Sequence, residues 1–274
     1  EIVAIKRGIS MLKKYVYLLF LFIKNSLMLD LSYRTDFVVS LLTDSCSCLV
    51  RVLFVGFIFQ HVTMVGNWSF DHFMVYFGCA FIMEGIYMFF FFNGHTRISL
   101  KILTGEMDYF LSKPLSEIFY LSCHSSNIGS GISNLILGSI YLVHGMKNMQ
   151  LTVSLNQLVL FVSLFLCGLI LYFSISFIIN CLSFWILQTG VLFNLFLNMT
   201  DLLRYPGDIF PKGIQFFITF IIPFQFISIV PAKYLLGEVG TEYIGWSFFG
   251  AVIALVVVRV MYHYARKAYS SGRG

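Results

Sequence analysis

Charged residues are scarce in this chain. Only 11% of its 274 residues are charged, whereas an ordinary globular domain contains roughly 25%. Hydrophobic residues make up 58% of the sequence. This balance excludes a water-soluble enzyme and predicts an all-α integral membrane protein, with one membrane domain over residues 1–274. The formal net charge of +5 comes from basic residues that flank apolar runs, so we expect no nucleic-acid partner.

The cysteines and histidines also lack the spacing of a metal site. Cys46 and Cys48 are separated by one residue, which is not a zinc or redox spacing, and no second pair accompanies them. Histidines are dispersed, with no His-x-x-x-His pair on one helix face. We therefore predict no metal. The chain also has no G-x-x-x-x-G-K-[ST] phosphate loop, so we expect no cofactor bound by this chain.

Long apolar runs dominate what is present. The run from His72 to Asn93 carries one acid and no basic residue, and its about 22 residues are enough apolar helix to cross a bilayer. A Gly- and Ser-rich run at 118–143 is expected to pack closely on other helices. About six transmembrane helices are predicted, at 36–61, 72–93, 118–143, 155–187, 191–203 and 244–264.

Three segments do not fit the pattern of a simple span. Residues 10–35 combine an apolar face with several charges, which predicts an interfacial amphipathic helix. Residues 94–116 are polar and periodic, which predicts a short helix outside the lipid that ends at Pro114. In 204–235, Pro223 and Pro231 divide an apolar stretch into short pieces, so we expect a re-entrant helix pair surrounded by protein.

The distribution of Lys and Arg sets the expected orientation. Cytoplasmic segments of membrane proteins are rich in these residues. With the N-terminus inside, the outer segments hold only Lys147, Arg204, Lys212 and Lys233. Both termini are therefore expected in the cytoplasm, provided that the 214–235 segment does not cross the membrane.

Two short motifs carry a family resemblance. The first is GEMDYFLSKP at 105–114, and the second is RYPGDIFP at 204–211. Together with the layout of spans, they resemble the membrane subunit of a bacterial type-2 ATP-binding-cassette exporter, in a permease subfamily formerly described as of unknown function. The matching residues are Gly105, Asp108, Phe110, Leu111 and Pro114 in the first motif, and Arg204, Pro206, Asp208 and Pro211 in the second.

The resemblance implies a coupling helix within 94–116 that docks on a separate cytoplasmic ATPase. Two ATPase copies would bind ATP and Mg, and a second permease subunit, identical or paralogous, would complete the path in the bacterial cytoplasmic (plasma) membrane. The alternative is that 94–116 is only a solvated loop. The residues expected at the ATPase are Gly105, Glu106, Asp108, Phe110, Leu111 and Pro114. Those expected at an external gate are Arg204, Tyr205, Pro206, Asp208, Pro211, Pro223 and Pro231.

Charges inside the predicted spans are the next candidates, because a lone charge at mid-bilayer costs several kcal/mol. These are Asp44, Arg51 and Glu84. Arg51 and Glu84 lie at similar expected depths, which predicts an ion pair between the first two spans; contact with substrate is the alternative. Asp201 and Arg204, three residues apart, are expected to pair likewise.

A rival function remains open from sequence. The chain could be an ATPase-independent secondary transporter or a membrane-embedded lipid-modifying enzyme. Secondary transporters often carry broken helices in corresponding halves, but here only the C-terminal half has a Pro-broken segment. A membrane enzyme needs clustered titratable groups, and the sequence offers only the patch from Arg204 to Asp208.

Overall fold

The computed structural model describes residues 2–186, 194, 196–198, 200, 205–221 and 223–269. Within these residues the chain is helical and contains no β-strand, only an isolated bridge between Val65 and Trp68. Six helices are long and apolar enough to cross a membrane. The all-α membrane fold predicted from the sequence is therefore confirmed.

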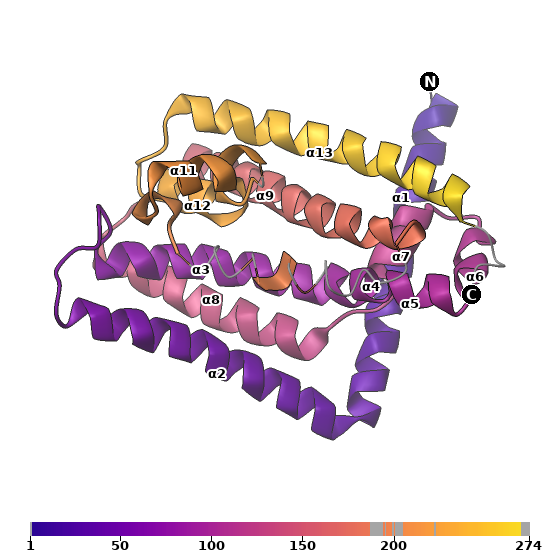
Figure 1. Cartoon of the computed structure of the whole chain (residues 1–274), viewed down its shortest axis with the longest axis horizontal. Coiled ribbons are helices and arrows are strands. Elements are labelled where there is room, and N and C mark those ends of the chain that lie inside the picture. Colours follow the sequence, from indigo (N-terminus) through magenta and orange to yellow (C-terminus); the bar gives the residue numbers. More distant parts are fainter. Residues whose placement is uncertain are drawn as a thin grey trace.

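Long helices lie side by side and form the body of the protein (Figure 1). α1 (Ile2–Ser32) instead crosses the others steeply at one end. Part of α1, Lys13–Ser32, is among the six candidate spans, although the sequence predicted an interfacial helix at 10–35. Most of the span predicted at 191–203 lies outside the described residues. The long helices of the body are α2 (Arg34–Phe59), α3 (Phe70–Tyr87), α8 (Ile128–Asn148), α9 (Leu155–Cys181) and α13 (Thr241–Ala268).

The predicted span at 72–93 is longer in the structure than expected. α3 continues without interruption through the π-helix η1 (Met88–Phe92), α4 (Asn93–Thr96) and, after Arg97, α5 (Ile98–Leu103). Within 94–116, where the sequence predicted a short helix, the structure forms more than one short helical piece. The chain turns at Gly105, whose φ of +74° favours glycine, and then forms α6 (Met107–Leu111), which ends before Pro114.

The predicted span at 118–143 is divided. α7 (Glu117–Cys123) stops at His124, and α8 begins only at Ile128. Asn127 explains the break, because its side chain accepts a hydrogen bond from the Ser130 N–H and caps the start of α8. By contrast, the span at 155–187 matches α9 and its extension η2 (Leu182–Phe184), and the span at 244–264 matches α13.

The C-terminal Pro-containing segment folds into short helices. These are η4 (Gly207–Ile209), α11 (Lys212–Phe216), η5 (Phe217–Ile221) and α12 (Gln225–Leu235). Pro231 was expected to break the helix, but it lies inside α12. As proline has no N–H, Pro231 cannot bond the Ile227 carbonyl four residues earlier. That carbonyl instead lies against Gly168 of α9, where a Cβ would collide with it.

Glycines bring α3 and α8 into direct contact. Gly131, Gly138 and Gly145 recur every seven residues along α8. A Cβ added at Gly138 would lie 2.8 Å from the Ile82 nitrogen, and one added at Gly145 would lie 2.8 Å from the Val75 nitrogen. The close packing predicted for the Gly- and Ser-rich run is therefore confirmed, with α3 as its partner.

We predict that Gly138→Ala destabilises the protein although alanine favours helix. The new methyl group meets backbone atoms of α3, which cannot rotate away, and overpacking of this kind costs about 1–3 kcal/mol. The control is Gly245→Ala on α13, where an added Cβ has nothing within 4 Å. Thermal unfolding in detergent should show a lower melting temperature for Gly138→Ala and an unchanged one for Gly245→Ala. Equal stability of the two variants would contradict the close contact between α3 and α8.

Candidate functional site

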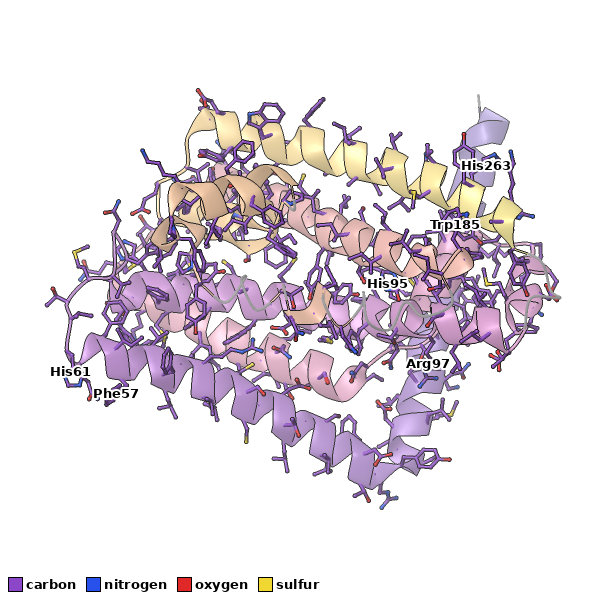
Figure 2. All side chains as sticks on the ribbon, in the orientation of Figure 1. Phe57, His61, His95, Arg97, Trp185 and His263 are labelled. Carbon is purple, nitrogen blue, oxygen red and sulfur yellow. The ribbon has the colours of Figure 1, made fainter. Side chains whose placement is uncertain are left out.

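The predicted coupling and gate segments lie at opposite ends of the helical body (Figure 1). We call the end that holds α5, α6 and the last turns of α13 the α6 end. The other, here the α11 end, holds α11 and the loop between α2 and α3. Figure 2 shows Arg97, Trp185 and His263 toward the α6 end and Phe57 and His61 at the α11 end. Any signal between the two segments must therefore pass along the bundle.

The coupling residues predicted from sequence divide into exposed and buried groups. Glu106, Asp108 and Pro114 are exposed, and Gly105 and Leu111 are partly buried. Phe110 is buried, and its ring centroid lies 4.8 Å from that of Tyr120 in α7. The structure therefore places Phe110 as an anchor of the loop rather than on its outer surface.

A buried lysine holds the loop to the bundle. Lys101 is 4% exposed, and its Nζ lies 2.8 Å from His124 Nε2 and 4.1 Å from the Phe110 ring centroid. His124 Nδ1 lies 3.1 Å from the Leu121 carbonyl oxygen. Burial, and then the Lys101 charge, lower the pKa of His124 to about 4. A neutral His124 can therefore donate from Nδ1 and accept the Lys101 hydrogen bond at Nε2.

His95 joins α4, α7 and α9 inside the protein (Figure 2). This side chain is fully buried. Its Nδ1 lies 2.9 Å from Ser176 Oγ, and its Nε2 lies 3.1 Å from Ser122 Oγ. Ser176 also shares a hydrogen bond with the Tyr87 hydroxyl. Both ring nitrogens are thus satisfied by protein, which fixes the position of α4 relative to α7 and α9.

α7 is also fastened to α13. Glu117 Oε1 lies 3.0 Å from Arg266 Nη1, and the Tyr262 hydroxyl donates to Glu117 Oε2 at 2.9 Å. Sequence reasoning missed the contacts of Lys101, His95 and Glu117. Their only sequence signal was a titratable residue near the end of a predicted span. The contacts themselves could not be predicted, because the partners lie on other helices.

The intramembrane charges line one cavity of about 330 Å³ between α2, α3, α9 and α12. The ion pair predicted between Arg51 and Glu84 is present, with Arg51 Nη1 3.1 Å from Glu84 Oε2. Arg51 also lies 5.4 Å from the Phe81 ring centroid. Asp44, seven residues before Arg51 on α2, lines the same cavity. The structure therefore adds Asp44 to the pair that the sequence predicted, and the three charges line one cavity.

The predicted gate residues lie at the α11 end where they are described. Tyr205 and Pro211 are exposed, and Pro206 is buried. The Tyr76 hydroxyl of α3 donates to the Tyr205 carbonyl at 3.4 Å, and a Cβ at Gly207 would collide with the Gln225 side chain of α12. Pro223 is partly buried before α12, and Pro231 is buried within it. Asp201, Arg204 and the Asp208 side chain lie outside what the structure describes.

α12 is enclosed by protein, as the re-entrant prediction requires. Its residues from Gln225 to Ala232 are buried, and it packs against α9 and α3. Broken backbone at membrane depth is tolerated only where protein or water surrounds it. The packing of α12 against other helices therefore explains how a short, proline-containing helix is accommodated in a membrane protein.

We predict that Arg51 and Glu84 are energetically coupled. Removing one partner leaves the other charge inside the membrane, so Arg51→Gln with Glu84→Gln should show a coupling energy of about 0.5–3 kcal/mol. Reversible unfolding in mixed detergent micelles measures each corner of the cycle. The control cycle pairs Glu84→Gln with Arg34→Gln at the exposed start of α2 and should be additive. Additive losses of unfolding free energy in both cycles would show that Arg51 and Glu84 are not coupled.

Comparison with known families supplies the remaining observation. The model of the family described as ABC-2 family transporter protein matches residues 46–272, which is well over half of the chain. No curated protein matches the chain. The match covers the α6 end, the Pro-containing segment and the cavity residues other than Asp44. The chain therefore belongs to the ABC-2 family of transporter proteins and is a multi-pass membrane permease of an ABC transporter.

Proposed function

We propose that this permease is the membrane subunit of an exporter driven by a separate ATPase. The ATPase docks at the α6 end, through the turn at Gly105 and the exposed residues Glu106, Asp108 and Pro114. Nucleotide chemistry belongs to the ATPase, since the chain carries no phosphate loop. Two copies of each subunit form the transporter, with the second permease identical or paralogous.

One observation carries this proposal: a single helical run joins the cavity to the loop. The run Phe70–Leu103 bears Glu84 in the cavity wall and ends two residues before Gly105. The nineteen residue-to-residue steps from Glu84 to Leu103 span roughly 28 Å of helix. A displacement of the loop can therefore reach the cavity along one element.

The contacts of the loop support transmission of force rather than independent motion. Lys101, His124 and Phe110 hold the loop to α7, while Gly94 lies so close to the Ser122 carbonyl that no Cβ fits between them. The π-helix η1 lies between this fixed region and Glu84, and π-helical segments are frequent at functional sites. ATPase closure would tilt the α6 end about η1 and switch the cavity from inward to outward access.

The proposed location is the bacterial plasma membrane, with both termini and the α6 end in the cytoplasm. The basic residues near the α6 end support this orientation by the positive-inside rule. α1 then lies along the inner surface as an interfacial helix, which agrees with its steep angle to the bundle (Figure 1). α11 and α12 form the external gate.

We predict that a cysteine at Glu106 crosslinks to the ATPase. Glu106 is exposed beside the turn at Gly105, so a short bifunctional reagent should capture the partner in native membranes. The matched control is Lys147→Cys, exposed at the opposite end of α8. Mass spectrometry identifies the captured chain. Purification of an active transporter with no ATPase would favour the rival secondary transporter.

We predict that Lys212 and Glu238 are exposed on the same, outer side. Cysteines at these positions flank the re-entrant segment and should both react with an impermeant maleimide on intact cells. The cysteine at Glu106 should react only after permeabilisation. Reaction of Lys212→Cys and Glu238→Cys from opposite sides would mean that the segment between them crosses the membrane, and the gate would be rejected.

A further inference from the structure

The described wall of the cavity between α2, α3, α9 and α12 has an excess of negative charge. It contains the carboxylates of Asp44 and Glu84 and the guanidinium of Arg51. Arg51 and Glu84 lie 3.1 Å apart and offset each other. Asp44 adds a further carboxylate to the same wall. An uncompensated carboxylate within a span is costly, so a cationic guest would be stabilised here.

Aromatic rings form another part of the wall. Phe77, Phe81 and Tyr172 line the cavity. Phe77 and Phe81 stack with centroids 5.6 Å apart and an interplanar angle of 8°. Arg51 already lies over Phe81 at 5.4 Å, so a cation against a ring is compatible with this wall. Rings also provide flat apolar surface for the body of a guest.

A buried hydroxyl adds a polar group to the cavity wall. Ser228 of α12 lines the cavity and is 1% exposed. The Tyr76 hydroxyl of α3 lies beside its Oγ, but the contact does not reach the geometry of a regular hydrogen bond. The Ser228 hydroxyl can therefore still bond a polar group of a ligand. The cavity volume of about 330 Å³ is also within the range of small-molecule sites.

We infer that this cavity binds a small organic cation with an aromatic or apolar body. The charged nitrogen lies near Asp44, the body packs against Phe77 and Tyr172, and a polar group of the ligand bonds Ser228. An anion would face the excess carboxylate of the described wall, and a neutral molecule would leave that excess in place. That the ligand is the transported substrate rests on the proposed function; that it binds does not.

Ligands that differ only in charge test this inference on the unmodified protein. The full chain in lipid nanodiscs is titrated with phenethylammonium, neutral 2-phenylethanol and phenylacetate, and saturation-transfer NMR reports binding. Empty nanodiscs correct for partition into lipid. Phenethylammonium should bind about tenfold or more tightly than the other two, equivalent to about 1.4 kcal/mol. Equal binding of the cation and the neutral alcohol would overturn the inference.

Variants locate the site. Asp44→Asn keeps the shape and removes the charge, so cation binding should fall about tenfold, while Asp44→Glu should retain most of it. Asp36→Asn, on the exposed first turn of α2, is the matched control and should bind as the unmodified chain does. Ser228→Ala should weaken a hydroxyl-bearing cation such as tyramine more than phenethylammonium. Undiminished binding by Asp44→Asn would reject the site.

The ligand-binding test and the crosslinking test of the proposed function can fail independently. Failure of Glu106→Cys to capture an ATPase, with charge-selective binding intact, would reject the exporter and keep the cation site. Capture of the ATPase without charge-selective binding would keep the exporter and reject the cation site.

Discussion

Glycines at seven-residue intervals along α8 let its backbone lie against α3, and α3 also forms part of the cavity wall. In lipid no hydrophobic force drives helices together, so van der Waals contact and interhelical hydrogen bonds must hold them. At Gly138 and Gly145 the neighbouring atoms are backbone nitrogens of α3, which cannot move aside. α3 is thereby held in place along the length that bears Glu84. Helices α9 and α12 pack on α3 and on each other.

Polar side chains of the bundle have different surroundings at the two sites. At the α6 end, His95 bonds Ser176 and Ser122, and Lys101 bonds His124. These hydrogen bonds hold short helices together. At the cavity, Asp44 exceeds the positive charge of the described wall. A hydrogen-bonded end and a charged cavity suit a docking platform and a binding site.

Departures from regular helix coincide with functional elements in this fold. η1 is a π-helical segment within the long helical run between the cavity and the α6 end. Pro231 interrupts the hydrogen bonding of α12, and the freed Ile227 carbonyl lies against Gly168 rather than lipid. In both places neighbouring helices cover the irregular backbone, which is the condition for its presence in a membrane. Such segments can rearrange at lower cost than regular helix.

The sequence by itself determined the all-α membrane class, most of the spans and the pairing of Arg51 with Glu84. Hydrophobic run length and the cost of isolated charge are local properties that can be read without coordinates. Tertiary structure alone decided that α3 continues to Leu103, that 118–143 is divided at Asn127, that Pro231 stays within a helix and that Phe110 is buried. It also decided the partners of His95 and Lys101. These outcomes depend on neighbours distant in sequence, because a cap, a buried ring or a freed carbonyl is stabilised by what packs against it.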